Sequence, residues 1–180
     1  MARPEIEPIG SREVYRSRWM SVREDEILRP DGTRGLYGVV DKPDFAVIAA
    51  VAGGHVHLVE QYRYPVTGRY WEMPQGSWDK EAADPLGLAK AELREETGIV
   101  AESMQHVGHL FLAHGFSSQG YDIFLATGLS HRRPQLEPEE QGLVNRPFEI
   151  SAVEAMIRDG AIKDATTVAA FGLLRLRSLV

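Results

Sequence analysis

The segment from Asp84 to Gly98 constrains the fold most, because its start signal, stop signal and apolar spacing agree on one helix. Asp84 is a suitable N-cap, and Pro85 follows it at the first helical position. Gly98 suits the left-handed residue that ends many helices. At about 100° per residue, one stripe is formed by Leu86, Ala89, Leu93 and Thr97. We therefore predict a helix over residues 85–97 with this stripe against a core.

The same helix carries three carboxylates, those of Glu92, Glu95 and Glu96. Glu92 and Glu96 lie roughly 40° apart around the helix axis. Glu95 lies roughly 60° from Glu92, on the opposite side of Glu92 from Glu96. Like charges at this spacing repel, and negative charge near a helix C-terminus is unfavourable. A divalent cation would reverse both effects, and clustered carboxylates suit Mg²⁺ or Mn²⁺. The alternative is a solvated acidic face, the usual state of helical glutamates.

Alternating and apolar runs predict strands on both sides of this helix. Asp31-Gly32 marks a hairpin turn within an N-terminal group of strands. The apolar run 46–51 suits a buried strand, and residues 55–63 alternate. The strands are expected near residues 14–16, 20–28, 36–40, 46–51, 55–63, 106–113, 121–127 and 143–149.

Two more helices are expected towards the C-terminus. Ser151-Ala152-Val153-Glu154 has the capping-box pattern, which predicts a helix that starts there and ends at Gly160. Asp164 is expected to cap the last helix. Its apolar stripe would contain Ala169, Leu173, Leu176 and Val180. Because strands and helices mix without strict alternation, we predict an α+β fold with a mixed sheet between helices and a small N-terminal antiparallel sheet.

Composition disfavours several classes of protein. The 180 residues allow one domain and a small appendage. The chain has no cysteine, which excludes disulfides, thiolate metal sites and a cysteine nucleophile. Twenty basic and 26 acidic residues give a net charge of −6, which disfavours nucleic acid as the main partner. The apolar stretch 46–53 is too short to span a membrane, and no secretory signal is visible. We expect a cytoplasmic protein without a membrane partner.

The helix and its surroundings resemble the Nudix box. The family pattern ends in Arg-Glu-aliphatic-any-Glu-Glu-any-Gly-aliphatic, and residues 91–99 read Ala-Glu-Leu-Arg-Glu-Glu-Thr-Gly-Ile. Residues 71–76, Trp-Glu-Met-Pro-Gln-Gly, are similar to the strand that leads into the box. Ala91 stands in place of the Arg, and Ala83 in place of an upstream Glu, with one extra residue after Gly76. The resemblance implies a Nudix α/β/α sandwich, with residues 43–180 as the catalytic domain.

The resemblance also implies a metal-dependent enzyme that uses Mg²⁺ or Mn²⁺. Glu92 and Glu96 would hold the metal, with the backbone carbonyl of Gln75 as another ligand. Glu95 would be a further ligand or a catalytic base. The metal would polarise a diphosphate and orient an attacking water.

The missing arginine of the box has no simple replacement on a helical wheel. An Arg at position 91 would lie one turn before Glu95 and could orient it. Lys90 and Arg94 point about 100° or more away from the direction of Glu95. Glu81 lies two residues from Ala83 and could reach inward from a longer loop. We therefore expect a weakened or retuned site.

Other segments resemble the branch of ADP-ribose and nucleotide-sugar pyrophosphatases. Gln61-Tyr62-Arg63 is similar to a segment whose Arg contacts substrate phosphates; a structural ion pair is the alternative for Arg63. Residues 114–119, His-Gly-Phe-Ser-Ser-Gln, occupy the place of the branch's Pro-Gly-Phe/Tyr-Ser-x-Glu loop. This implies substrate binding by Phe116 and puts Gln119 where the branch has an acid. Glu139 and Glu140, in an acidic loop, are candidate bases, with a solvated turn as the alternative.

Residues 1–42 resemble the branch's N-terminal leader, which swaps between the subunits of a homodimer. The resemblance implies a homodimer through residues 12–41. Trp19 and Tyr15 are candidates for stacking on the substrate base, with a packing role as the alternative for each.

The leading hypothesis is therefore a hydrolase that cleaves the pyrophosphate of ADP-ribose or a nucleotide sugar to a nucleoside monophosphate and a sugar phosphate. A Nudix-fold nucleotide-binding module with little turnover is the first alternative, motivated by Ala83, Ala91 and Gln119. A hydrolase of dinucleoside polyphosphates or nucleoside triphosphates is the second. The intact spacing of Glu92, Glu95 and Glu96 favours hydrolysis.

Overall fold

The computed structural model describes residues 5–77, 84–134, 136 and 142–180. Glu81, Ala83, Glu139 and Glu140, singled out above, lie outside the described residues. The chain forms two compact units, which are described separately. The first combines the described residues up to Asp44 with Phe111–Gly120, and the second combines Phe45–Leu110 with Tyr121–Val180.

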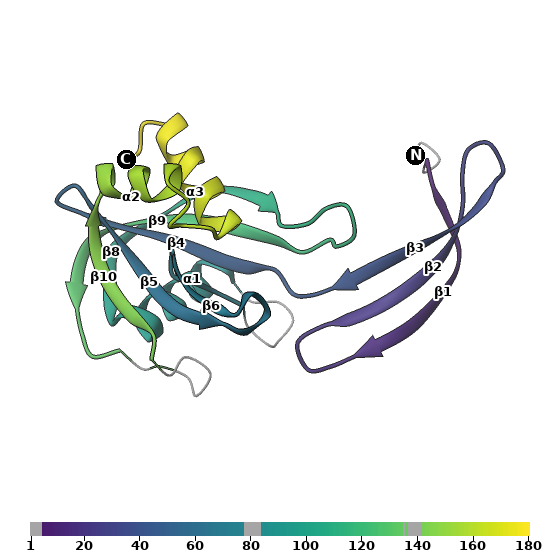
Figure 1. The fold of residues 1–180 in the computed structure, drawn as a ribbon, viewed down its shortest axis with the longest axis horizontal. Helices are drawn as coiled ribbons and strands as arrows, with labels where there is room; N and C mark the ends of the chain where they lie inside the picture. Colours follow the sequence, from purple (N-terminus) through teal and green to yellow (C-terminus); the bar gives the residue numbers. More distant parts are fainter. Residues whose placement is uncertain (1–4, 78–83, 135, 137–141) are drawn as a thin grey trace. The chain divides into compact units, whose positions relative to one another are not determined.

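The first unit contains a three-stranded antiparallel sheet, in the order β1-β2-β3 (Figure 1). Its strands are β1 (Glu7–Arg16), β2 (Ser21–Leu28) and β3 (Arg34–Asp41). The predicted hairpin turn lies between β2 and β3, where Gly32 has a φ of 83° that suits glycine. The small N-terminal antiparallel sheet is therefore confirmed.

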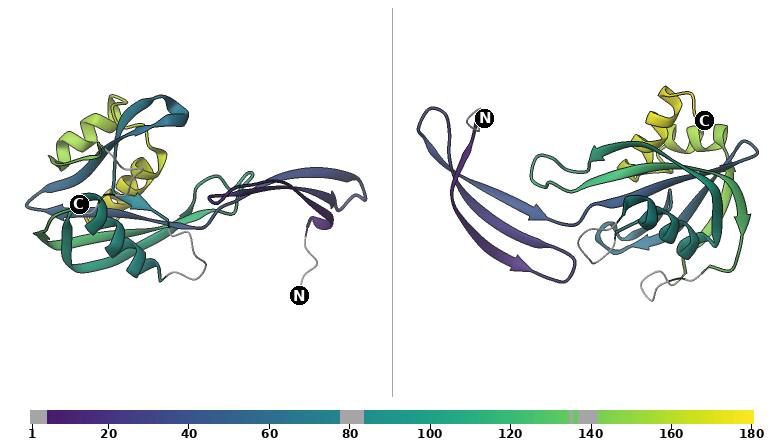
Figure 2. Two further views of the ribbon diagram at one scale, coloured as in Figure 1. Left: turned by 90° about the horizontal axis from the view of Figure 1, so that it is seen from below. Right: turned by 180° about the vertical axis from the view of Figure 1, so that it is seen from behind.

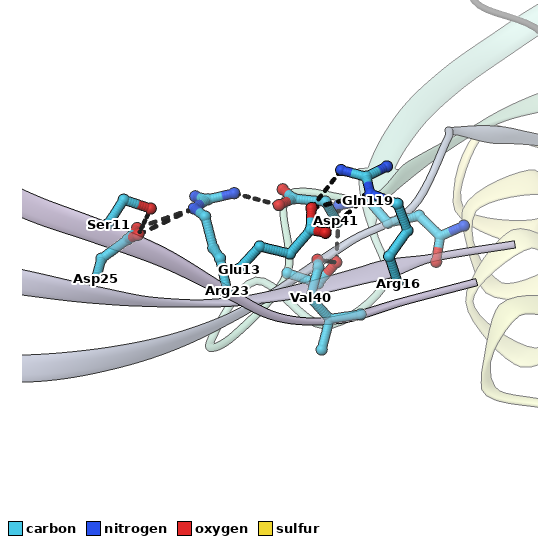
Figure 3. A network of polar contacts seen from close by, with 9 residues as sticks. Ser11, Glu13, Arg16, Arg23, Asp25, Val40, Asp41 and Gln119 are labelled. Atoms are coloured by element: carbon cyan, nitrogen blue, oxygen red, sulfur yellow. Dashed lines mark hydrogen bonds and ion pairs between the residues drawn. The ribbon is translucent and has the colours of Figure 1, made fainter. Parts of the chain in front are cut away.

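Polar contacts tie these three strands together (Figure 3). Arg23 on β2 donates to Asp25 on the same strand, with 3.0 Å between Nε and Oδ2, and to Asp41 at the end of β3. The Ser11 hydroxyl donates to Asp25 Oδ1 at 2.6 Å. These bonds from Ser11 and Arg23 lower the pKa of Asp25. The sheet is thus held by ionic contacts across it as well as by its backbone.

The second unit contains a seven-stranded mixed sheet. Its path is β10-β5-β4-β9-β8, with β6 paired to β5 and β7 paired to β4. The β4–β9 pair is parallel, whereas β5 runs antiparallel to both β4 and β10. The strands are β4 (Phe45–Ala52), β5 (His55–Arg63), β6 (Gly68–Glu72), β7 (Gln75–Gly76), β8 (Ile99–Phe111), β9 (Gly120–His131) and β10 (Val144–Glu149). A short 3₁₀ helix, Tyr64–Val66, joins β5 to β6.

Helices cover both faces of this sheet (Figures 1 and 2). Alternate residues of β4 belong to two separate cores: Ile48 packs with Leu93 of α1, and Val47 packs with Val153 of α2 and Phe171 of α3. The helices are α1 (Pro85–Thr97), α2 (Ile150–Arg158) and α3 (Ala165–Leu176). The predicted α/β/α sandwich with a mixed sheet is therefore confirmed.

The predicted signals at both ends of α1 are confirmed. Asp84 accepts hydrogen bonds from the backbone nitrogens of Leu86 and Gly87, each at 3.1 Å. Gly98 is left-handed, with a φ of 70°, and a Cβ there would overlap the carbonyl oxygen of Arg132. Glycine is thus required at this helix end for both its φ and its space.

Two other sequence predictions are wrong. The capping box at Ser151 does not form, because β10 runs directly into α2 and Glu149 is the N-cap, without a side-chain cap bond. The predicted stripe on α3 also fails, because Leu176 is 86% exposed. The buried face of α3 consists of Thr166, Thr167, Ala170, Phe171 and Leu174. The sequence does not mark these threonines as core residues, because a buried hydroxyl needs a hydrogen-bond partner that the sequence does not reveal. No helix within the described ranges is long and apolar enough to span a membrane.

Candidate active site

Two of the three box glutamates lie against the short strand β7. Leu93 anchors α1 in the core, and the adjoining face of the helix carries Glu92 and Glu96 towards β7. Glu96 is only 2% exposed, and its Oε2 accepts a hydrogen bond from the Gln75 backbone nitrogen at 3.2 Å. The Glu92 carboxylate lies so close to Gly76 that a Cβ there would overlap it. Two carboxylates from one helix therefore meet the same pair of backbone residues.

Glu95 has a different neighbour. Its Oε1 lies 3.2 Å from an Nη of Arg94, and the two side chains are 31% and 49% exposed. Arg94 and Glu95 lie about 100° apart on the helical wheel, so the wheel does not predict this contact. It forms because an arginine side chain is long enough to bend back to the next residue. Arg94 makes a contact with Glu95 of the kind expected from the absent Arg at position 91.

Arg63 forms an ion pair with a buried glutamate. Glu72 is 3% exposed, and it accepts bonds from Arg63 Nε at 3.3 Å and from Gln61 Nε2 at 2.9 Å. Burial raises the pKa of Glu72, against the opposing effect of the Arg63 charge. The Arg63 side chain remains 41% exposed. The ion pair thus fixes one edge of the guanidinium and leaves another accessible.

A second network joins β7 to the start of α3. Gln75 Nε2 donates to Asp164 Oδ2 at 3.2 Å, and the Thr167 hydroxyl donates to the same oxygen at 2.7 Å. The backbone nitrogen of Met73 donates to Thr167 Oγ1 at 2.8 Å. Sequence reasoning identified Asp164 only as a helix cap and missed the roles of Thr167, Glu72 and the Gln75 side chain.

The remaining predicted binding residues belong to the first unit. Trp19 is 57% exposed, and the Arg18 guanidinium lies 4.4 Å from its ring centroid. Phe116 is 55% exposed. Gln119 is 4% exposed, and its Nε2 donates to the Pro43 carbonyl at 2.7 Å. An ionised acid could not donate that bond, so the amide at position 119 matches its surroundings.

The donor set around β7 suits a hard divalent cation. Among the described residues, no three histidine, aspartate or glutamate side chains form a complete cage for a metal ion. Mg²⁺ does not need such a cage, because it usually keeps several waters and takes one or two carboxylates together with substrate phosphates. The carboxylates of Glu92 and Glu96, beside the backbone of Gln75, match that mode of binding.

Two family models match the chain and together span most of it. Residues 6–40 match the nucleoside diphosphate sugar hydrolase N-terminal domain, and residues 41–170 match the NUDIX domain. The chain therefore belongs to the Nudix family. Its relatives assign it more narrowly to the branch that contains the ADP-ribose pyrophosphatases.

Three similar proteins cover nearly the whole chain. An ADP-ribose pyrophosphatase from Mycobacterium tuberculosis is 31% identical over 94% of this chain and 83% of its own length. A methanol dehydrogenase activator from Bacillus methanolicus is 30% identical over 96% of this chain and 94% of its own length. The crystal structure of an ADP compounds hydrolase has a TM-score of 0.85 at 20% identity, covering 97% of this chain and 95% of that one. The protein is thus a Nudix pyrophosphohydrolase of nucleoside diphosphate derivatives.

Proposed function

We propose that this enzyme is a Mg²⁺- or Mn²⁺-dependent hydrolase of ADP-ribose or a nucleotide sugar. It would release a nucleoside monophosphate and a sugar phosphate. The observation that carries this proposal is the convergence of Glu92 and Glu96 on the backbone of Gln75 and Gly76. The similarity to ADP-ribose pyrophosphatases from M. tuberculosis and Bacillus subtilis, the latter at 26% identity, supports this choice of substrate.

The proposed metal ligands are the carboxylates of Glu92 and Glu96 and the Gln75 carbonyl, with Glu95 as a further ligand or a base. A bound cation would polarise the diphosphate and favour deprotonation of a water molecule. Glu96 is buried, so it is positioned without freedom to turn towards solvent. Arg94 would hold the Glu95 carboxylate in place through the ion pair between them.

Arg63 is proposed to bind the substrate phosphates through the exposed part of its guanidinium. Its pair with Glu72 fixes the orientation of that group, which a flexible cation would lack. In the reaction, the water oxygen bonds to one phosphorus, the bridging P–O bond breaks, and the leaving phosphate takes the electron pair. Glu95, Glu139 and Glu140 are the proposed acceptors of the proton of that water.

The first unit is proposed to bind the substrate base and to form a homodimer. Trp19 and Phe116 both expose large aromatic surfaces suited to stacking. A three-stranded sheet needs a packed face for stability, yet apolar side chains such as Val14, Tyr15 and Leu36 are 49%, 52% and 62% exposed. A second copy of the chain would cover them.

Chromatographic product analysis on a substrate panel tests the proposed activity. The panel would contain ADP-ribose, nucleotide sugars, dinucleoside polyphosphates and nucleoside triphosphates, each with Mg²⁺, Mn²⁺ or a chelator. We expect metal-dependent release of a nucleoside monophosphate and a sugar phosphate from the first two classes. Cleavage confined to the last two would contradict the proposed substrate. Nucleotide binding without any product would instead support a binding module.

A further inference from the structure

Thr167 and Asp164 connect the start of α3 to the loop that enters β7. Thr167 is fully buried, and its hydroxyl both accepts from the Met73 backbone nitrogen and donates to Asp164. The bond between Met73 and Thr167 joins residues 94 positions apart in the chain. The Asp164 carboxylate also accepts from the Thr167 backbone nitrogen at 2.8 Å, which fixes it at the helix N-terminus.

Gln75 is held by residues of two different helices. Its backbone nitrogen donates to Glu96 of α1, and its side-chain amide donates to Asp164, at 3.2 Å in each case. Its backbone also pairs with Val47 of β4. Gln75 is therefore held jointly by α1, α3 and the sheet. The bond to α3 is one of the contacts that hold the residue whose backbone meets Glu96.

We propose that Thr167 and Asp164 are positioning residues of the active site. They fix the segment from Met73 to Gln75 so that its backbone meets Glu96 and the cation that Glu96 helps to hold. This inference rests on the metal-dependent function proposed above. Neither residue is assigned contact with the substrate. They act through Gln75, as outer-shell partners act on metal ligands in other enzymes.

Conservative substitutions of Thr167 test this proposal. Thr167→Val keeps the branched shape but removes the hydroxyl that receives the Met73 bond and donates to Asp164. Thr167→Ser keeps the hydroxyl. Thr166→Val is the matched control, since Thr166 is the same residue type in the same turn and is 3% exposed. Gln75→Met removes the side-chain amide that donates to Asp164 and keeps the backbone N–H and carbonyl of residue 75.

Two measurements on the whole protein are needed, binding of Mn²⁺ by electron paramagnetic resonance and steady-state kinetics. We expect Thr167→Val to weaken Mn²⁺ binding about tenfold or more, as losses of outer-shell partners do. The kcat should fall while the KM for substrate stays close to wild type. Thr167→Ser should restore both values, Gln75→Met should weaken Mn²⁺ binding, and Thr166→Val should match wild type.

A folded Thr167→Val variant with wild-type Mn²⁺ affinity and wild-type kcat would overturn the proposal. If Thr167→Val does not fold, Gln75→Met decides, and an unchanged Mn²⁺ affinity in that variant refutes the positioning role. A different result would contradict the proposed function, namely wild-type protein that binds Mn²⁺ but cleaves no diphosphate. The binding comparison still tests Thr167 in that case.

Discussion

Arg94 is a residue whose role depends on side-chain reach. The Nudix pattern has an arginine at position 91, where this chain has Ala91. In this chain Arg94, the residue before Glu95, contacts the Glu95 carboxylate. Both side chains are partly exposed, so the pair contributes little to stability. Any effect of the pair should therefore appear in turnover, through the orientation of Glu95.

Arg94→Ala is expected to lower kcat with almost no change in thermal stability. A partly exposed ion pair contributes at most about 1 kcal/mol, which corresponds to roughly fivefold in rate. Ala91→Arg in the Arg94→Ala background should recover the lost turnover, because it restores the arginine of the family pattern. Lys90→Ala removes an exposed cation of the same helix and serves as the control. Unchanged kcat in Arg94→Ala, measured at saturating substrate and metal, would show that the ion pair has no catalytic role.

Residue-level prediction succeeded where spacing within one helix was enough. The wheel put Glu92 and Glu96 on one face of α1, and the structure has both against β7. It could not find the contact between Gln75 and Asp164, because those residues are 89 positions apart and meet only after folding. The metal and substrate roles assigned to these residues remain proposals.

Among the elements, α1 was predictable because its signals are local. Asp84 and Gly98 act within one turn of the helix they bound. The same kind of signal failed at Ser151, since β10 continues to Glu149 and its pairing with β5 determines where α2 begins. Strand β8 begins at Ile99, well before the predicted 106, because backbone pairing extends a strand through residues that are mostly not buried.

Strands β1, β2 and β3 were also predictable, from alternation and the Asp31-Gly32 turn. The sequence did not predict that Phe111–Gly120 belongs to the same unit as these strands. It depends on bonds such as those from the Ser117 hydroxyl to the Val40 carbonyl at 2.7 Å and from Gln119 to Pro43. These contacts join residues more than 70 positions apart, which periodicity does not report.

At the scale of the whole molecule, the exposed apolar side chains of the first unit predict a homodimer. Sedimentation velocity should show a dimer for the wild-type protein. Leu36→Asp should weaken that dimer about tenfold or more, because an interface would then bury an unpaired charge. Leu176→Asp is the control, at an 86% exposed site on α3 of the second unit. A wild-type protein that sediments as a monomer at every concentration would rule out the proposed dimer.

In the proposed mechanism, Glu96, which is buried against Gln75, holds the catalytic metal. The most direct test is the Mg²⁺ dependence of kcat for Glu96→Gln beside wild type, with circular dichroism as a check on folding. Because the variant loses the charge of one metal ligand and keeps its shape, we predict a fall in kcat of about a hundredfold or more. The folded structure should be unchanged. A Glu96→Gln variant with full activity and the wild-type Mg²⁺ response would contradict the assignment.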